Sequence, residues 1–114
     1  MRQRQPRKYE PDHLAWVRQL PCLLCGDNTS TEAAHIRMAD IRVAKPITGV
    51  GTKPDDKYVL PLCSECHRKQ HHRGEERFWT DEGRHHIDPV LIALALHSVT
   101  GDHDAGMTII QSYH

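Results

Sequence analysis

The sequence predicts an α+β fold: a small domain of two strands and several helices, held together by a metal ion. Three observations lead to this prediction. Four cysteines form two Cys-x-x-Cys pairs, two short strand-like runs flank a long irregular segment, and a helical run follows the second strand directly. With 114 residues, 38% of them hydrophobic and 5% aromatic, the chain has material for one domain with a thin core. Domains of this kind are usually stabilised by a disulfide or a metal.

Two strands are predicted in the middle of the chain. Residues 32–38 and 58–62 are short and apolar, and the segment between them, residues 39–57, is rich in proline and glycine. Two strands joined in this way favour an antiparallel hairpin with a splayed end. An irregular segment of this length in so small a domain is more often a functional loop than a plain connector.

A helix is predicted immediately after the second strand. Ser64 is a good N-cap, and the helix runs to about Arg73, where Gly74 occupies the C-terminal cap position. A further helical turn then places Phe78 and Trp79 inward.

Helices are also predicted near both ends of the domain. Asp12 is a plausible N-cap for a helix over residues 12–20. The Asp88-Pro89 pair is a strong helix start, and the apolar run that follows predicts a helix over residues 89–100. These two helices are expected to brace the hairpin and its central helix.

The charges divide the chain into three parts. The formal net charge is zero, so bulk charge does not predict nucleic-acid binding. Residues 1–10 are predicted to form a basic flexible arm, residues 11–101 the domain, and residues 102–114 a C-terminal tail without a readable element. A basic arm commonly holds a phosphate backbone, although a solvated terminus explains the same pattern equally well. The basic residues of the arm are Arg2, Arg4, Arg7 and Lys8.

No apolar run approaches 18 residues, and no apolar region follows the basic N-terminus as it would in a signal peptide. The sequence therefore predicts a soluble, cytoplasmic protein with no membrane partner. In that compartment thiols stay reduced and bind metals more readily than they form disulfides.

The two cysteine pairs together predict a structural zinc site. Zinc takes four ligands in a tetrahedral arrangement, and two Cys-x-x-Cys turns brought together by a hairpin supply them. A redox pair would leave the other pair unexplained, and a zinc deaminase would need an acidic residue that is missing after His13. The four predicted ligands are Cys22, Cys25, Cys63 and Cys66.

Three histidines predict a second, catalytic site. His67 and His71 are four residues apart, so on a helix both rings project from one face and can hold a divalent metal. His35 lies in the first strand, where strand, loop, strand and helix would place it across from that metal as a general base for phosphodiester hydrolysis. Basic residues of the same helix are candidates to hold flanking phosphates, although a solvated helix face is the simpler explanation for at least one of them. They are Arg68, Lys69 and Arg73.

The strings AAHI and VLPLCSECHRKQH, set within the two cysteine pairs, resemble the HNH endonuclease superfamily with its ββα-metal core. The wider pattern over residues 12–96 is most similar to the recombination-enhancement nucleases of phages and prophages, the Ref-type, RecA-dependent group. The resemblance implies metal-dependent DNA cleavage with His35 as the base, His67 and His71 as metal ligands, and the cysteines around a structural zinc.

The chain departs from the HNH pattern at two positions. The residue before the base is commonly a metal ligand, but here it is Ala34, so Asp40 or water is expected to supply the third ligand. The central asparagine is also missing. Asp56 or Tyr58 lies near its place, and either is expected to orient the loop of His35 by a hydrogen bond.

The function expected from the sequence is therefore a DNA endonuclease linked to phage recombination. It would use Zn²⁺ for structure and Mg²⁺ or another divalent metal for catalysis, with DNA as a partner. The resemblance to the Ref-type nucleases implies a recombinase filament as a further partner. The main alternative is a zinc-containing DNA-binding module that has lost its catalytic metal. A third class, a structural adaptor that recruits a recombinase, would not bind DNA at low salt.

Overall fold

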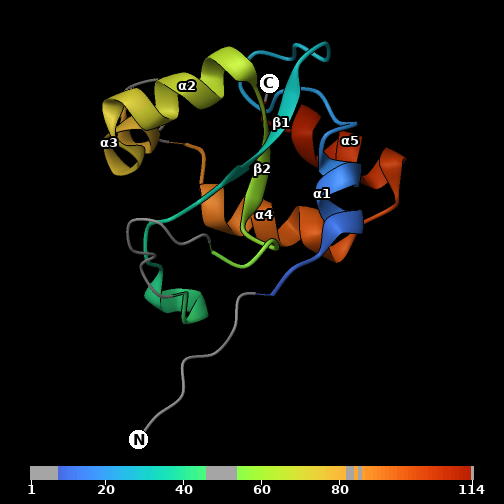
Figure 1. The fold of residues 1–114 in the computed structure, drawn as a ribbon, viewed down its shortest axis with the longest axis horizontal. Coiled ribbons are helices and arrows are strands. Elements are labelled where there is room, and N and C mark those ends of the chain that lie inside the picture. The colour runs from blue at the N-terminus through green and yellow to red at the C-terminus, as the bar shows by residue number, and fades with distance from the viewer. Residues whose placement is uncertain (1–7, 46–53, 82–83, 85, 114) are drawn as a thin grey trace, which may run out of the picture.

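The structure is a computed structural model, and it describes residues 8–45, 54–81, 84 and 86–113. A hairpin lies at the centre of the molecule: α2 and α3 lie on one side of it, α1 and α5 lie on the other, and α4 passes beneath its lower end in this view (Figure 1). In chain order the elements are α1 (Pro11–Val17), β1 (Thr31–His35), η1 (Ile41–Val43), β2 (Val59–Cys63), α2 (Ser64–Arg73), α3 (Glu75–Thr80), α4 (Pro89–Ser98) and α5 (His103–Gln111).

The two strands pair antiparallel, as predicted. Thr31 lies opposite Cys63, and His35 lies opposite Val59. All five residues of β2 are buried, whereas β1 is largely half-exposed. In the hairpin, β2 therefore belongs to the core, whereas β1 remains partly accessible to solvent.

Strand β1 is shorter than predicted, and the reason lies in α3. The backbone N–H groups of Arg37 and Met38 donate to the carboxylate of Glu75, at 2.8 to 2.9 Å. After Ile36, whose N–H still bonds the carbonyl of Tyr58, the chain thus leaves the ladder and is held by the first turn of a helix. The prediction of a strand to Met38 was wrong by three residues.

Helix α1 begins one residue earlier and ends three residues earlier than predicted. Glu10, and not Asp12, is the N-cap, with Pro11 in the first helical turn, where its fixed φ suits the helix. After Val17 the chain continues in tighter turns, with Leu20 N–H bonding the Val17 carbonyl at 3.1 Å. Leu20 is nonetheless buried in the core, as expected.

The central and following helices agree with the prediction except at one cap. Cys63, and not Ser64, is the N-cap of α2, because the Cys63 sulfur accepts the N–H of Cys66. Helix α2 ends at Gly74, which has a φ of 85°, and α3 buries both Phe78 and Trp79. The carboxylate of Asp88 accepts the N–H of Leu91, so it caps α4 as predicted.

The segment after residue 101 is not a tail. It forms α5, which the carboxylate of Asp102 caps by accepting the N–H of Ala105 at 3.1 Å. Ile110 is fully buried, and Gly106 lies directly against the rings of Trp16. Tertiary packing, which short-range sequence signals do not report, makes this helix part of the core.

None of the helices among the described residues is long and apolar enough to cross a membrane. Residues 46–53 of the predicted irregular loop, and Arg2, Arg4 and Arg7 of the predicted arm, lie outside the described residues.

Candidate functional site

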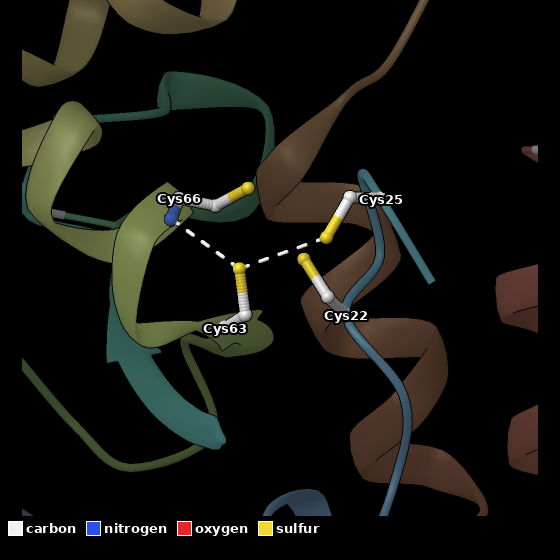
Figure 2. Close-up of side chains that lie close together, drawn as sticks. All are labelled: Cys22, Cys25, Cys63 and Cys66. Atoms are coloured by element: carbon white, nitrogen blue, oxygen red, sulfur yellow. Dashed lines mark hydrogen bonds between the residues drawn. The ribbon is translucent and has the colours of Figure 1, made fainter. Parts of the chain in front are cut away.

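The four cysteines converge on one point beside the N-terminus of α2, as predicted. Their sulfur atoms all lie within 4.8 Å of one another, and Sγ of Cys25 is 3.6 Å from Sγ of Cys63. Figure 2 shows one pair approaching from the loop after α1 and the other from the junction of β2 and α2. In the part of the chain that the structure describes, this is the only group of three or more potential ligands gathered so closely.

Local hydrogen bonds shape each cysteine pair. In the first, Gly26 N–H bonds the Cys22 carbonyl at 2.9 Å, and the positive φ of Gly26, 79°, favours glycine in this turn. In the second, the Cys63 sulfur accepts the N–H of Cys66 at 3.4 Å, so it also caps α2. Backbone hydrogen bonds thus shape the turn of each cysteine pair.

The donor set fits zinc. Zn–S bonds of about 2.3 Å in a tetrahedron place neighbouring sulfurs roughly 3.8 Å apart, close to the separation seen here. Burial, and next the neighbouring Cys63 thiol, raise the pKa of Cys66 well above its ordinary value. Without a cation the Cys66 thiol is therefore protonated, and a bound Zn²⁺ would compensate for its ionisation.

His35, at the end of β1, forms a buried pair with Asp56. Its Nε2 lies 2.9 Å from Oδ1 of Asp56, a carboxylate that is fully buried. A carboxylate oxygen accepts, so Nε2 carries the hydrogen and Nδ1 is the basic nitrogen of the neutral ring. Of the two residues predicted to orient His35, Asp56 is the one whose side chain bonds the ring.

His67 and His71 face each other on α2. Their Nε2 atoms are 3.1 Å apart, near the roughly 3.3 Å expected for two nitrogens bound to one ion at about 2.0 Å. Glu32 of β1 accepts a hydrogen bond from Nδ1 of His67 at 2.7 Å. This bond leaves the lone pair on Nε2, the side that points at His71. Carboxylates commonly support metal-binding histidines in this way.

The surroundings of His71 favour its neutral form. Burial, and next the neighbouring His67 and Arg37, lower its pKa from the ordinary value. A neutral imidazole is the form that binds metals.

The described residues do not join the histidine pair and His35 into one cluster. Alternation along β1 places Glu32 and Ala34 on one face and His35 on the other. Asp40, the predicted third ligand, caps η1 and binds the guanidinium of Arg42. The structure thus shows Asp40 in contact with Arg42, and its role as a metal ligand stays a prediction.

The other predicted residues have ordinary surroundings. Tyr58 is buried, with the ammonium of Lys45 5.0 Å from its ring centre. Lys69 is exposed and 3.7 Å from Glu65, Arg73 pairs with Asp81, and Arg68 is exposed. The side chain of Lys8 is exposed, while its backbone N–H bonds Asp55.

The sequence analysis missed the residues that hold the histidines. Glu32 was not singled out, although it is two residues from Ala34 and therefore on the same face of β1. Glu10, whose N–H bonds Oδ2 of Asp56 at 2.8 Å, carries no local signal because its partner is 46 residues away.

Comparison with known proteins places the chain in a family without assigning an activity. None of the curated proteins and none of the solved structures compared with it matches. A family model described as "Protein of unknown function (DUF968)" matches residues 1–96, most of the chain. The chain therefore belongs to the DUF968 family of proteins of unknown function.

Proposed function

We propose that this protein is a metal-dependent endonuclease that hydrolyses DNA phosphodiester bonds. The observation that carries the proposal is that two histidines are each bonded by a carboxylate, His35 by Asp56 and His67 by Glu32. Asp56 fixes the tautomer of His35, and Glu32 fixes that of His67 next to His71. Three histidines held in defined protonation states are expected at a catalytic site rather than on a solvated surface.

In this proposal His35 is the general base. Its Nδ1 takes the proton from the attacking water, and the resulting imidazolium is stabilised by the buried carboxylate of Asp56. Burial of Asp56 keeps this carboxylate away from competing water, so the ring stays in one orientation.

His67 and His71 would hold the divalent metal, Mg²⁺ or another ion of similar charge, with Glu32 as the support of His67. A bound divalent metal would polarise the phosphate and neutralise charge on the leaving oxygen. Glu32 is half-exposed, so its carboxylate has room to move toward the ion in place of the ligand missing at Ala34.

DNA is the proposed substrate because of the basic residues near this site. Arg68, Lys69 and Arg73 lie on α2, the helix that carries the histidine pair. The resemblance to recombination-enhancement nucleases extends the proposal to recombination-linked DNA processing with a recombinase filament as partner. The cysteine cluster would hold a structural Zn²⁺ that keeps α2 in place.

The test is cleavage of single-stranded and duplex DNA by the purified protein with Mg²⁺ or Mn²⁺. We expect His35→Ala to abolish cleavage while DNA binding persists, and the matched variant His72→Ala, an exposed neighbour of the pair, to cleave normally. Full cleavage by His35→Ala would rule out this mechanism.

A second candidate is a zinc-bound DNA-binding module without catalysis. The separation of His35 from the histidine pair in the described residues favours it. Metal analysis distinguishes the two candidates. One zinc per chain, unchanged in His67→Ala and His71→Ala, indicates the binding module, whereas a second, labile metal lost in both variants indicates the nuclease.

A further inference from the structure

A short N-terminal strap, residues 8–10, lies along Asp55 and Asp56. Lys8 N–H bonds Oδ1 of Asp55 at 2.8 Å, and the Lys8 carbonyl accepts the N–H of Asp56 at 3.0 Å. Glu10 N–H then bonds Oδ2 of Asp56 at 2.8 Å. Three hydrogen bonds over three residues hold the strap to this segment, although it is about 46 residues away in the chain.

The third of these bonds reaches the proposed catalytic pair. Asp56 is fully buried, so its carboxylate must be satisfied by the protein. Oδ1 faces the ring of His35 and Oδ2 faces the peptide N–H of Glu10. The orientation of this carboxylate, and with it the orientation of the His35 ring, depends on where the backbone of residue 10 lies.

The Glu10 side chain connects that backbone to helix α4. Its Oε1 accepts a hydrogen bond from Nε2 of His97, on α4, at 2.9 Å. The His97 ring packs edge-on against His13, with ring centres 4.9 Å apart, and Nδ1 of His13 bonds the hydroxyl of Thr100 at 2.8 Å. Residue 10 is thus held from both sides, by its peptide and by its carboxylate.

Maintaining this contact has a cost. Oε2 of Glu10 is buried and has no hydrogen-bond partner among the described residues. A buried polar atom without a partner is unfavourable, because it gives up its hydrogen bonds to water and gains none in the protein. An apolar side chain at residue 10 would avoid this penalty. We therefore explain the Glu10 carboxylate by the position that it gives to the backbone of residue 10, and not by a gain in stability.

We infer that Glu10 is a positioning residue for the proposed general base: by bonding His97, it holds the peptide group that orients Asp56 and, through it, His35. The inference rests on the proposed function for its effect on catalysis, but the positioning itself is a property of the folded protein. Arg7 directly precedes the strap in sequence, so DNA held by the basic arm would be connected by only a few residues to the group that orients His35.

The test uses the full-length protein and two readouts. The first is the tautomeric state of His35, from ¹⁵N NMR of the imidazole, and the second is the division between kcat and KM for DNA cleavage. In the wild type we expect one tautomer, with hydrogen on Nε2. Glu10→Ala should produce mixed tautomers and lower kcat about 10-fold at unchanged KM, because misplacing a catalytic group by about 1 Å can cost up to about 100-fold.

Glu10→Gln is the conservative variant. Its side-chain oxygen still accepts the hydrogen bond from His97, so both the single tautomer and kcat should be restored. Glu65→Ala, which removes an exposed carboxylate paired with Lys69, is the matched control and should change neither readout. His97→Ala removes the same contact from α4 and takes the place of Glu10→Ala if that variant fails to fold.

A single Nε2–H tautomer in folded Glu10→Ala and His97→Ala would overturn the inference. The inference would also be overturned if Glu10→Gln showed the same mixture of His35 tautomers as Glu10→Ala. If the protein cleaves no DNA, the proposed function fails, but the tautomer measurement still decides whether the strap positions His35.

Discussion

Glu32 Oε1 lies 2.7 Å from Nδ1 of His67, which links strand β1 to helix α2 across the face of the hairpin. This contact determines which nitrogen of His67 carries hydrogen and directs the other toward His71. It also identifies an acidic residue on the same strand face as Ala34, where the HNH pattern lacks its usual ligand. The predictions below test this contact and four others.

Removing Glu32 should weaken metal binding without unfolding the protein. Loss of a carboxylate that supports a metal-binding histidine typically lowers affinity by about 10- to 100-fold. We expect this for Glu32→Ala in calorimetric titrations with Mn²⁺, and no change for Glu65→Ala, an exposed carboxylate on the same helix as the histidines. Equal Mn²⁺ affinities in Glu32→Ala and wild type would show that the contact has no role in binding metal.

Asp56→Asn should impair cleavage far more than stability. The amide keeps the volume of the buried carboxylate but presents an N–H to one of its two partners, so the His35 ring is driven toward the wrong tautomer. By analogy with carboxylates that orient catalytic histidines, we expect single-turnover cleavage to fall by about 10²- to 10⁴-fold. Thermal unfolding of the same samples checks that the fold persists. If Asp56→Asn cleaved DNA at the wild-type rate, Asp56 would have no role in catalysis.

Cys63→Ser should abolish zinc binding and destabilise the fold. Cys63 is buried, belongs to the cysteine cluster proposed to hold zinc, and also caps α2, so its substitution would remove one of the four proposed ligands and loosen the helix. Zinc content by elemental analysis and helix content by circular dichroism should fall together, as they do where metal binding and folding are coupled. Ser64→Ala, one residue away and exposed, should keep both.

Stability should fall as the pH drops below about 6.5, in part because of His13. Burial, and next the neighbouring His97, lower the pKa of His13 in the folded protein, while Glu10 and Asp56 oppose the shift. Between the folded pKa and the unfolded value of about 6.5, the unfolded chain binds more protons, so stability rises with pH and is fully present above 6.5.

The variant His13→Asn tests this assignment. Asparagine keeps a donor for the hydroxyl of Thr100 but does not titrate, so its melting temperature should fall less than that of the wild type between pH 7 and pH 5. Parallel pH curves for the two proteins would mean that another group is responsible.

Gly106→Ala should destabilise the protein by about 1–3 kcal/mol, the usual cost of overpacking a core. A Cβ at this position would lie 2.8 Å from Cζ2 of Trp16 and 3.3 Å from Cδ2 of Leu20. Chemical denaturation measures the effect, and Thr108→Ala on the exposed side of α5 is the control. A gain in stability would mean that helix propensity outweighs the close contact.

The parts of the fold predicted well are those governed by short-range signals. The Asp88-Pro89 start of α4, the glycine that ends α2 and the two cysteine turns each depend on a few adjacent residues. Helix α5 was missed because Gly106 and Thr108 are weak helix formers, and the helix forms by packing against Trp16.

The candidate site shows the same division. The spacing of His67 and His71 predicts that their rings face each other, because both lie on one helix. Of the carboxylate partners, Asp56 was one of two residues predicted to orient His35, and its side chain bonds the ring. Glu32 was not predicted, since 35 residues separate it from His67 and no local pattern connects the two. Asp40 was predicted as a third metal ligand, and in the structure its carboxylate accepts a hydrogen bond from Arg42, two residues away.

The cysteine cluster also determines where the chain can change in length. It closes the segment between Cys25 and Cys63 at its base, so β1, β2 and α2 keep their register whatever the length of the connection between Lys45 and Pro54. The entropic cost of lengthening a closed loop is small, about 0.6 kcal/mol for each doubling. Insertions and deletions in that connection are therefore expected to leave the pairing of the hairpin and the position of α2 unchanged.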